Sequence, residues 1–190
     1  MKNNEKGRSM VEMLGVLAII GVLSAGGLAG YSKAMFKHKL NTTMDQITML
    51  VTNIRTMFGT QENYENLSVP FAIKLGIVAQ SARGGTNNSK MINPFKGEVT
   101  LNPVDVKGSV PNSGFTITYD GLPSEACVAI ATADWGTGPG SGFVGVSAGL
   151  GTNATASTIG AANEGMPYKV TDAIDDCATS TTTSVTLYFY

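Results

Sequence analysis

The sequence predicts an α+β protein in which a long N-terminal α-helix packs on an antiparallel β-sheet. The first observation is that no proline occurs before Pro70, while apolar residues recur throughout this region. The second is that short segments beyond Gly59 alternate polar and apolar side chains, as half-buried strands do. Because the helical pattern comes first and the strands follow it, the order of elements favours α+β over α/β.

The size and charge of the chain limit what it can be. Its 190 residues can form one domain with a real core and, in addition, an anchor. Only 14% of the residues are charged, and the formal net charge is −1. Such a chain has no excess of positive charge to attract a polyanion, so we expect no nucleic-acid partner.

The N-terminal helix is predicted to have two parts. Met13 to Ser32 contains no charged residue and is long enough to cross a bilayer, which takes about 20 apolar residues. Beyond it, one helical face carries an apolar stripe that needs a partner: Leu40, Met44, Ile47, Val51, Ile54 and Phe58. One helix from about Met10 to Phe58 would be about 70 Å long at 1.5 Å per residue. Two helices broken at Gly26-Gly27 or Gly30 are the alternative, since an interior Gly costs about 1 kcal/mol relative to Ala.

Four segments of the C-terminal part have the period-2 pattern of strands, and turn residues surround them. They are Glu98 to Leu101, Phe115 to Tyr119, Phe143 to Val146 and Ser184 to Tyr190. Leu122 to Ile130 has a proline near its start and apolar residues at helical spacing, which predicts a short helix. We therefore expect an antiparallel sheet with a short helix in the middle of its strands.

A single carboxylate stands at the start of the apolar run. Glu12 is the only charged residue between Arg8 and Lys33. A carboxylate at the centre of a bilayer costs roughly 2.5–3.5 kcal/mol on insertion scales, so it should have a partner. Cleavage after Gly7 would create an amine at Arg8 and make Glu12 the fifth residue of the new chain. This arrangement resembles the cleavage and methylation signature of type IV prepilins, whose mature chains usually begin with Phe or another apolar residue in place of Arg8.

The resemblance implies a domain organisation. Residues 1–7 would be a leader peptide, residues 8–58 a long helix, and residues 59–190 a globular head. Residues 8–32 would be the hydrophobic part of the helix, which lies first in the membrane and later in the core of a filament.

The resemblance also implies a function and partners. The chain would be a structural subunit of a type IV pilus and not an enzyme, and copies of it would form a helical homo-oligomer. A prepilin peptidase would cut it, Arg8 would be N-methylated, and Glu12 would act in assembly by the pilus platform and its ATPase. The precursor would lie in the bacterial inner membrane and the assembled pilus outside the cell.

Other interpretations of the chain remain open at this point. A secretory signal peptide could end near Ser24-Ala25-Gly26, but Glu12 argues against it. A plain membrane anchor fits the length of the apolar run and gives no reason for the spacing of Gly7 and Glu12. A pseudopilin of a type II secretion system would share this N-terminus. A membrane-anchored enzyme would need a catalytic set of residues, and we find neither a Ser-His-Asp set nor a phosphate-binding loop.

Two motifs of the head resemble those of type IVb pilins. Asn93-Pro94-Phe95-Lys96-Gly97 resembles the entry into their first head strand, and Pro123 to Cys127 resembles the helix that carries their first disulfide cysteine. The short leader is instead more similar to the IVa branch. Cys127 and Cys177 can pair in an exported head, because disulfides persist in an oxidising compartment. This pairing would close the C-terminal region of the fold.

The residues that could bind a metal are few, and we expect no cofactor. A zinc site is improbable with one His, His38, which we interpret as a solvated helix residue. Asp172, Asp175 and Asp176 could be imagined as calcium ligands, but their spacing fits no known calcium loop, and a solvated helix or turn is the favoured interpretation. The Gly-rich stretch from Gly136 to Gly165 is either a surface loop or a contact segment of a filament.

Overall fold

The computed structural model describes residues 10–105, 110–136, 142–149, 168–178 and 182–190. The chain divides into two compact units, Met1–Lys39 and Leu40–Tyr190. We call the described part of the first unit the stem and the second unit the head. The first helix, α1 (Met10–Phe58), contributes to both units, so that its second part belongs to the head.

Helix α1 confirms the prediction of one long N-terminal helix. It contains 49 residues and continues through Gly26, Gly27 and Gly30, so the helix break considered for these glycines is wrong. A Cβ atom placed on any of the three would meet no atom within 4 Å. The helix ends where the chain turns at Gly59, and the backbone N–H of Gln61 donates to the carbonyl of Phe58 at 2.9 Å.

The head contains one six-stranded sheet, and every pairing in it is antiparallel. The strands are β1 (Arg83–Gly84), β2 (Lys90–Ile92), β3 (Glu98–Val104), β4 (Gly114–Leu122), β5 (Phe143–Ala148) and β6 (Thr183–Phe189). Their order in the sheet is β1-β2-β3-β4-β6-β5. The four predicted strands are therefore confirmed as β3 to β6, and the last strand in sequence lies inside the sheet.

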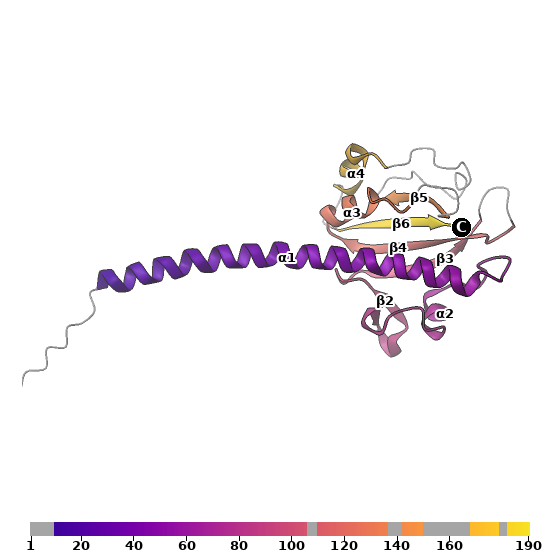
Figure 1. The fold of residues 1–190 in the computed structure, drawn as a ribbon, viewed down its shortest axis with the longest axis horizontal. Helices are drawn as coiled ribbons and strands as arrows, with labels where there is room; N and C mark the ends of the chain where they lie inside the picture. Colours follow the sequence, from indigo (N-terminus) through magenta and orange to yellow (C-terminus); the bar gives the residue numbers. More distant parts are fainter. Residues whose placement is uncertain (1–9, 106–109, 137–141, 150–167, 179–181) are drawn as a thin grey trace, which may run out of the picture. The chain divides into compact units, whose positions relative to one another are not determined.

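Short helices lie toward both edges of this sheet. They are α2 (Val69–Lys74), the 3₁₀ turns η1 (Gln80–Ala82) and η2 (Thr86–Asn88), α3 (Ser124–Ala131) and α4 (Val170–Cys177). Helix α2 contacts β2 and β3, whereas α3 contacts β5 and β6 and α4 contacts β5. Figure 1 shows the two groups on opposite sides of β4 and β6. Helix α3 confirms the short helix that the Leu122 to Ile130 pattern predicted.

The core forms between the second part of α1 and the sheet. The buried residues of α1 are Thr43, Ile47, Leu50, Ile54 and Phe58. The predicted stripe is thus right at three of its six positions, while Leu40, Met44 and Val51 are only half-buried. Thr43 and Leu50, the neighbours of Met44 and Val51, take the inner positions. Ring contacts continue this core, with centroids 5.3 Å apart for Phe58 and Tyr64 and 4.8 Å apart for Tyr64 and Phe115.

Candidate functional site

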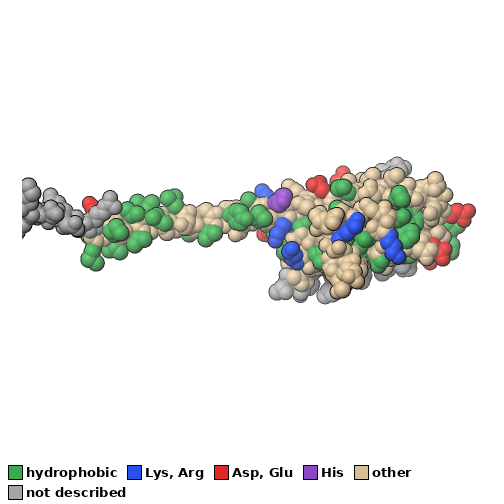
Figure 2. Space-filling view, turned by 90° about the horizontal axis from the view of Figure 1, so that it is seen from below, with side chains coloured by type: hydrophobic (Ala, Val, Ile, Leu, Met, Phe, Trp, Pro, Cys, Tyr) green, Lys and Arg blue, Asp and Glu red, His purple; other side chains and the backbone are tan. Residues whose placement is uncertain are grey.

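The stem is an exposed apolar helix. Large apolar side chains face outward on every side of it, and Figure 2 shows green groups of them along one face of the stem. Within the described residues, α1 is the helix long and apolar enough to cross a membrane. An apolar helix that is exposed all round needs a lipid or protein environment, so the stem defines a surface for insertion or for packing against other helices.

Glu12 is the single acidic residue on this surface. It lies in the first turn of α1 and is exposed there. A carboxylate in the first helical turn is favoured by the partial positive charge of the helix N-terminus. Gly7 and Arg8, the predicted cleavage and methylation positions, lie outside the described residues.

The disulfide predicted for the head is present. Cys127 of α3 and Cys177 of α4 form it with a Cα–Cα distance of 5.9 Å, and both residues are completely buried. The two cysteines are 50 residues apart in sequence and lie on different helices, so the bond fixes the position of α4 on the rest of the head. The C-terminal region is therefore closed by a disulfide as expected.

The Asn93 motif forms a tight turn between β2 and β3. The buried side chain of Asn93 accepts from the backbone N–H groups of Phe95 at 2.9 Å and Gly97 at 3.0 Å, and it donates to the carbonyl of Asp120 at 2.7 Å. Position 97 requires glycine because its backbone lies close to that of Asp120: a Cβ there would lie 1.6 Å from the Asp120 carbonyl oxygen. Burial, with a smaller contribution from the charge of Glu98, raises the pKa of the Asp120 carboxyl.

Replacing Asn93 with Ala should therefore destabilise the head. The variant leaves three part-buried backbone groups without their partner. A backbone group that is buried and unpaired costs about 1–3 kcal/mol. We expect a loss of about 3 kcal/mol in the free energy of unfolding, measured by urea titration of the detergent-solubilised chain. Lys96→Gly is the matched control in the same turn: Lys96 has φ = 76°, where Gly is unstrained, so this variant should keep or raise stability. An Asn93→Ala variant as stable as the parent would contradict the role of this side chain.

A pair of hydrogen bonds, which the sequence did not reveal, connects α1 to Tyr190, the residue after β6. The guanidinium of Arg55 donates to the backbone carbonyl of Tyr190 at 2.6 Å, and the N–H of Tyr190 donates to the carbonyl of Gly142 at 2.8 Å. Gly142 has φ = 65°, and a Cβ on it would lie 1.1 Å from the Arg55 Nη2 atom. The sequence could have indicated Gly142, because it stands just before a predicted strand. It could not have indicated the contact with Arg55, which is 87 positions away.

The three aspartates before Cys177 lie on α4. Asp172 and Asp175 are exposed, whereas Asp176 accepts a hydrogen bond from the Tyr168 hydroxyl. The described residues contain no group of three His, Cys, Asp or Glu side chains that could hold a metal ion. Of the Gly-rich stretch from Gly136 to Gly165, the structure describes Gly136 and residues 142–149, which include β5, and the rest lies outside the described residues.

Comparison with known structures identifies the class of the fold. A crystal structure of a type IVb pilin from Salmonella typhi superposes with a TM-score of 0.55 and 21% identity, covering 77% of this chain and 97% of that one. The type IV pilin TcpA from Vibrio cholerae El Tor superposes with a TM-score of 0.52 and 14% identity, covering 80% of this chain and 99% of that one. An apolar N-terminal helix whose second part packs on an antiparallel sheet, with a disulfide near the C-terminus, is thus the fold of a type IV pilin.

Comparison of sequences then gives the family. The model of the family described as Bundlin matches residues 33–189. The major structural subunit of bundle-forming pilus from Escherichia coli O127:H6 is 27% identical over 136 residues, which are 72% of this chain and 68% of that protein. The chain belongs to the Bundlin family and is a type IV pilin, and its fold is similar to that of a type IVb pilin. These relatives do not favour the pseudopilin alternative.

Proposed function

We propose that this chain is the repeating structural subunit of an extracellular type IV pilus. The observation that carries the proposal is the stem, an apolar helix exposed all round, with one carboxylate, in a chain whose head is stabilised separately by its own core and disulfide. A relative that is 27% identical over 136 residues is named a major structural subunit of bundle-forming pilus. The role is structural and involves no catalysis.

Maturation in this proposal begins in the inner membrane. A prepilin peptidase removes residues 1–7, and the new amine at Arg8 is methylated. The pilus platform and its ATPase then move the subunit out of the bilayer. The stem leaves lipid for a filament core made of the stems of other copies, so its apolar surface stays out of water in both states.

Gly7→Val should leave the leader attached. A small residue at the cleavage position lets the backbone approach an active site closely, and Val adds a branched side chain there. We expect intact mass spectrometry of membranes to show mainly uncut precursor. Gly15→Val is the matched control, since a Cβ on Gly15 meets no atom within 4 Å and the variant should be cut normally. Normal cleavage of Gly7→Val, or a mature N-terminus near Gly26, would contradict the assignment.

The test of the whole proposal is the protein in filaments sheared from cells. Its intact mass should equal residues 8–190 with one added methyl group and one disulfide. Deleting the chain should remove these filaments. If deletion instead abolishes secretion of other proteins and cells carrying the chain show no filaments, the pseudopilin alternative is correct.

A further inference from the structure

Two lysines follow directly after the apolar part of the stem. Lys33 and Lys37 are the first charged residues after Glu12, and both side chains are exposed on α1. A spacing of four residues puts them on one face of the helix, one turn apart. Neither lysine forms an ion pair with a residue that the structure describes. Since like charges at this spacing repel each other, an anion that contacts both would stabilise the pair.

The residues around this pair are those of a membrane–water interface. Tyr31, two positions before Lys33, is 65% exposed. Tyr is enriched at the level of lipid headgroups, because its ring is apolar and its hydroxyl polar, and Lys side chains near the ends of membrane helices extend to the same level. The charged residues between Glu12 and Asp45 are all basic, namely Lys33, Lys37 and Lys39. The end of the apolar run thus carries positive charge where the phosphate groups of lipids lie.

The distance from Lys33 to Glu12 matches the thickness of a bilayer. The two residues are 21 positions apart on one continuous helix. At 1.5 Å per residue this is about 32 Å, and the hydrocarbon core of a bilayer is about 30 Å thick. When Lys33 lies among the headgroups of one leaflet, Glu12 therefore reaches the headgroups of the other. Neither charge then lies in hydrocarbon, where it would be costly.

Basic residues of the head differ from this pair. Arg83 donates to a backbone carbonyl at 2.9 Å, and Lys90 pairs with Glu98 at 2.9 Å, so these two cations already have partners. Lys74 and Lys96 are exposed, but they lie on different elements, and neither adjoins an uncharged run long enough to enter a membrane. They are therefore suitable controls for the lysines of the stem.

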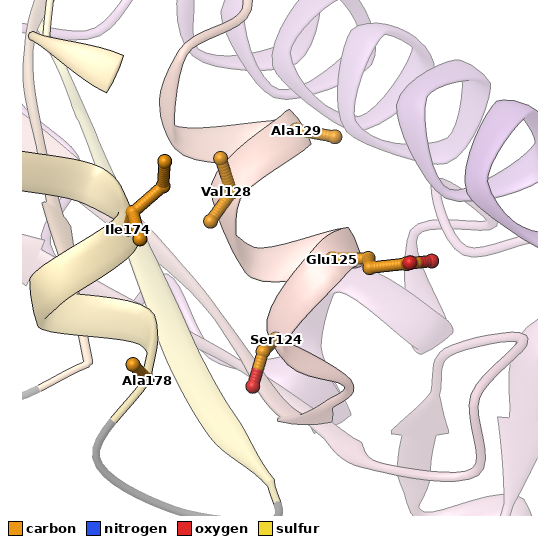
Figure 3. Close-up of a pocket in the computed structure, with 6 residues that line it drawn as sticks. All are labelled: Ser124, Glu125, Val128, Ala129, Ile174 and Ala178. Atoms are coloured by element: carbon orange, nitrogen blue, oxygen red, sulfur yellow. The ribbon is translucent and has the colours of Figure 1, made fainter. Parts of the chain in front are cut away.

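The surface formed by α3 and α4 is acidic instead. Figure 3 shows the Glu125 side chain standing out from α3, and Asp172 and Asp175 are exposed on α4. Three carboxylates on neighbouring helices repel a phosphate group, because like charges disfavour contact. Of these surfaces, only the end of the stem combines two adjacent cations with an apolar run.

We propose that Lys33 and Lys37 together bind the phosphate group of one anionic phospholipid while the subunit lies in the membrane. The two ammonium groups contact the phosphate from adjacent turns of α1, and the acyl chains of the lipid lie along the apolar part of the stem. The contact fixes the depth of the stem in the bilayer and so keeps Glu12 at the opposite surface. This inference rests on the membrane stage of the proposed function and adds a ligand to it.

Native mass spectrometry of the purified full chain measures this binding without any filament. The chain is released from detergent that contains equal amounts of phosphatidylglycerol and phosphatidylcholine with the same acyl chains. Phosphatidylcholine has the phosphate but also a cationic group, so it offers the lysines no net charge. We expect the parent chain to retain one phosphatidylglycerol about tenfold more often than phosphatidylcholine, because each lysine near an anionic lipid adds to binding.

Paired variants assign this preference to the two lysines. Lys33→Gln combined with Lys37→Gln should reduce it to near equality, whereas Lys33→Arg combined with Lys37→Arg should keep it, since Arg also binds phosphate. Gln and Arg both favour helix, so α1 should stay intact in either variant. Lys74→Gln combined with Lys96→Gln is the matched control: it removes the same charge from the head and should keep the tenfold preference.

Three results would overturn the inference. The first is equal retention of the two lipids by the parent, or an equal loss of preference in the Lys74 and Lys96 control. The second is displacement of the lipid by inorganic phosphate at the same concentration, because the site would then be one for free phosphate. The third is carbodiimide cross-linking of Lys33 or Lys37 to a carboxylate of a second copy in membranes, because an acidic side chain would then take the place of the phosphate. Each readout is independent of filaments, so any of these results would leave the pilus function standing.

Discussion

Removing the disulfide by Cys127→Ala combined with Cys177→Ala is expected to lower the free energy of unfolding of the head by about 4 kcal/mol. The bond joins positions 50 residues apart, and in the chain-entropy model a loop of this length accounts for that amount. It also holds α4 against α3, where both cysteines are completely buried. Urea unfolding of the detergent-solubilised chain measures the difference, and proteolysis should show the region around α4 cut first.

Reduced parent protein is the control for this double variant. It lacks the cross-link but has the native side chains, so its stability should fall by a similar amount. Val128→Ala, which shortens one half-buried side chain of α3 and keeps the bond, should cost far less. A double variant within about 1 kcal/mol of the parent would show that packing of α3 and α4 suffices without the bond.

The large elements of the fold could be predicted because their patterns are long and local. Helix α1 has no internal proline, and an apolar stripe marks its second part, so its limits at Met10 and Phe58 were expected. The longer strands alternate polar and apolar residues over their whole length, as β6 does. The alternative of two helices broken at the stem glycines is wrong, because α1 runs through all of them as one helix.

The elements that were missed are short or polar. Helix α2 has six residues and β1 only two, and windows of that length contain no usable period. Thr43 is completely buried on α1 although its type predicts the surface. The hydrogen bond from Arg55 to Tyr190 joins distant parts of the chain, and no local sequence pattern indicates such a pair.

Some features of the candidate sites could also be predicted from the sequence, and others could not. The cysteine pair could be predicted from residue type and an exported location, and Glu12 from its position in an uncharged run. The hydrogen bond from the Asn93 side chain to the carbonyl of Asp120 could not, because Asn93 follows β2 and Asp120 lies near the end of β4, 27 positions apart in the sequence.

Glu12→Val is expected to abolish assembly while leaving the subunit intact. We propose that Glu12 pairs with the Arg8 amine of a neighbouring copy in the filament core, where an unpaired carboxylate would be costly. The other side chains of this part of the stem are apolar and exposed, and such contacts fix no axial position. One charge pair per subunit would therefore set the register of each incoming stem.

The variant separates assembly from all earlier steps, since Val suits an apolar helix and keeps the precursor in the membrane. We expect correctly cut protein in membranes and at least a tenfold loss of filaments by electron microscopy. Met13→Val, a change to the same side chain at the neighbouring exposed position, should assemble normally. Glu12→Gln keeps the size of the side chain without its charge. If the negative charge is what assembly requires, this variant should lose filaments as Glu12→Val does. If Glu12→Val cells carry the parent number of filaments made from cut protein, the carboxylate does not set the register, and its role would lie in recognition by the processing enzyme.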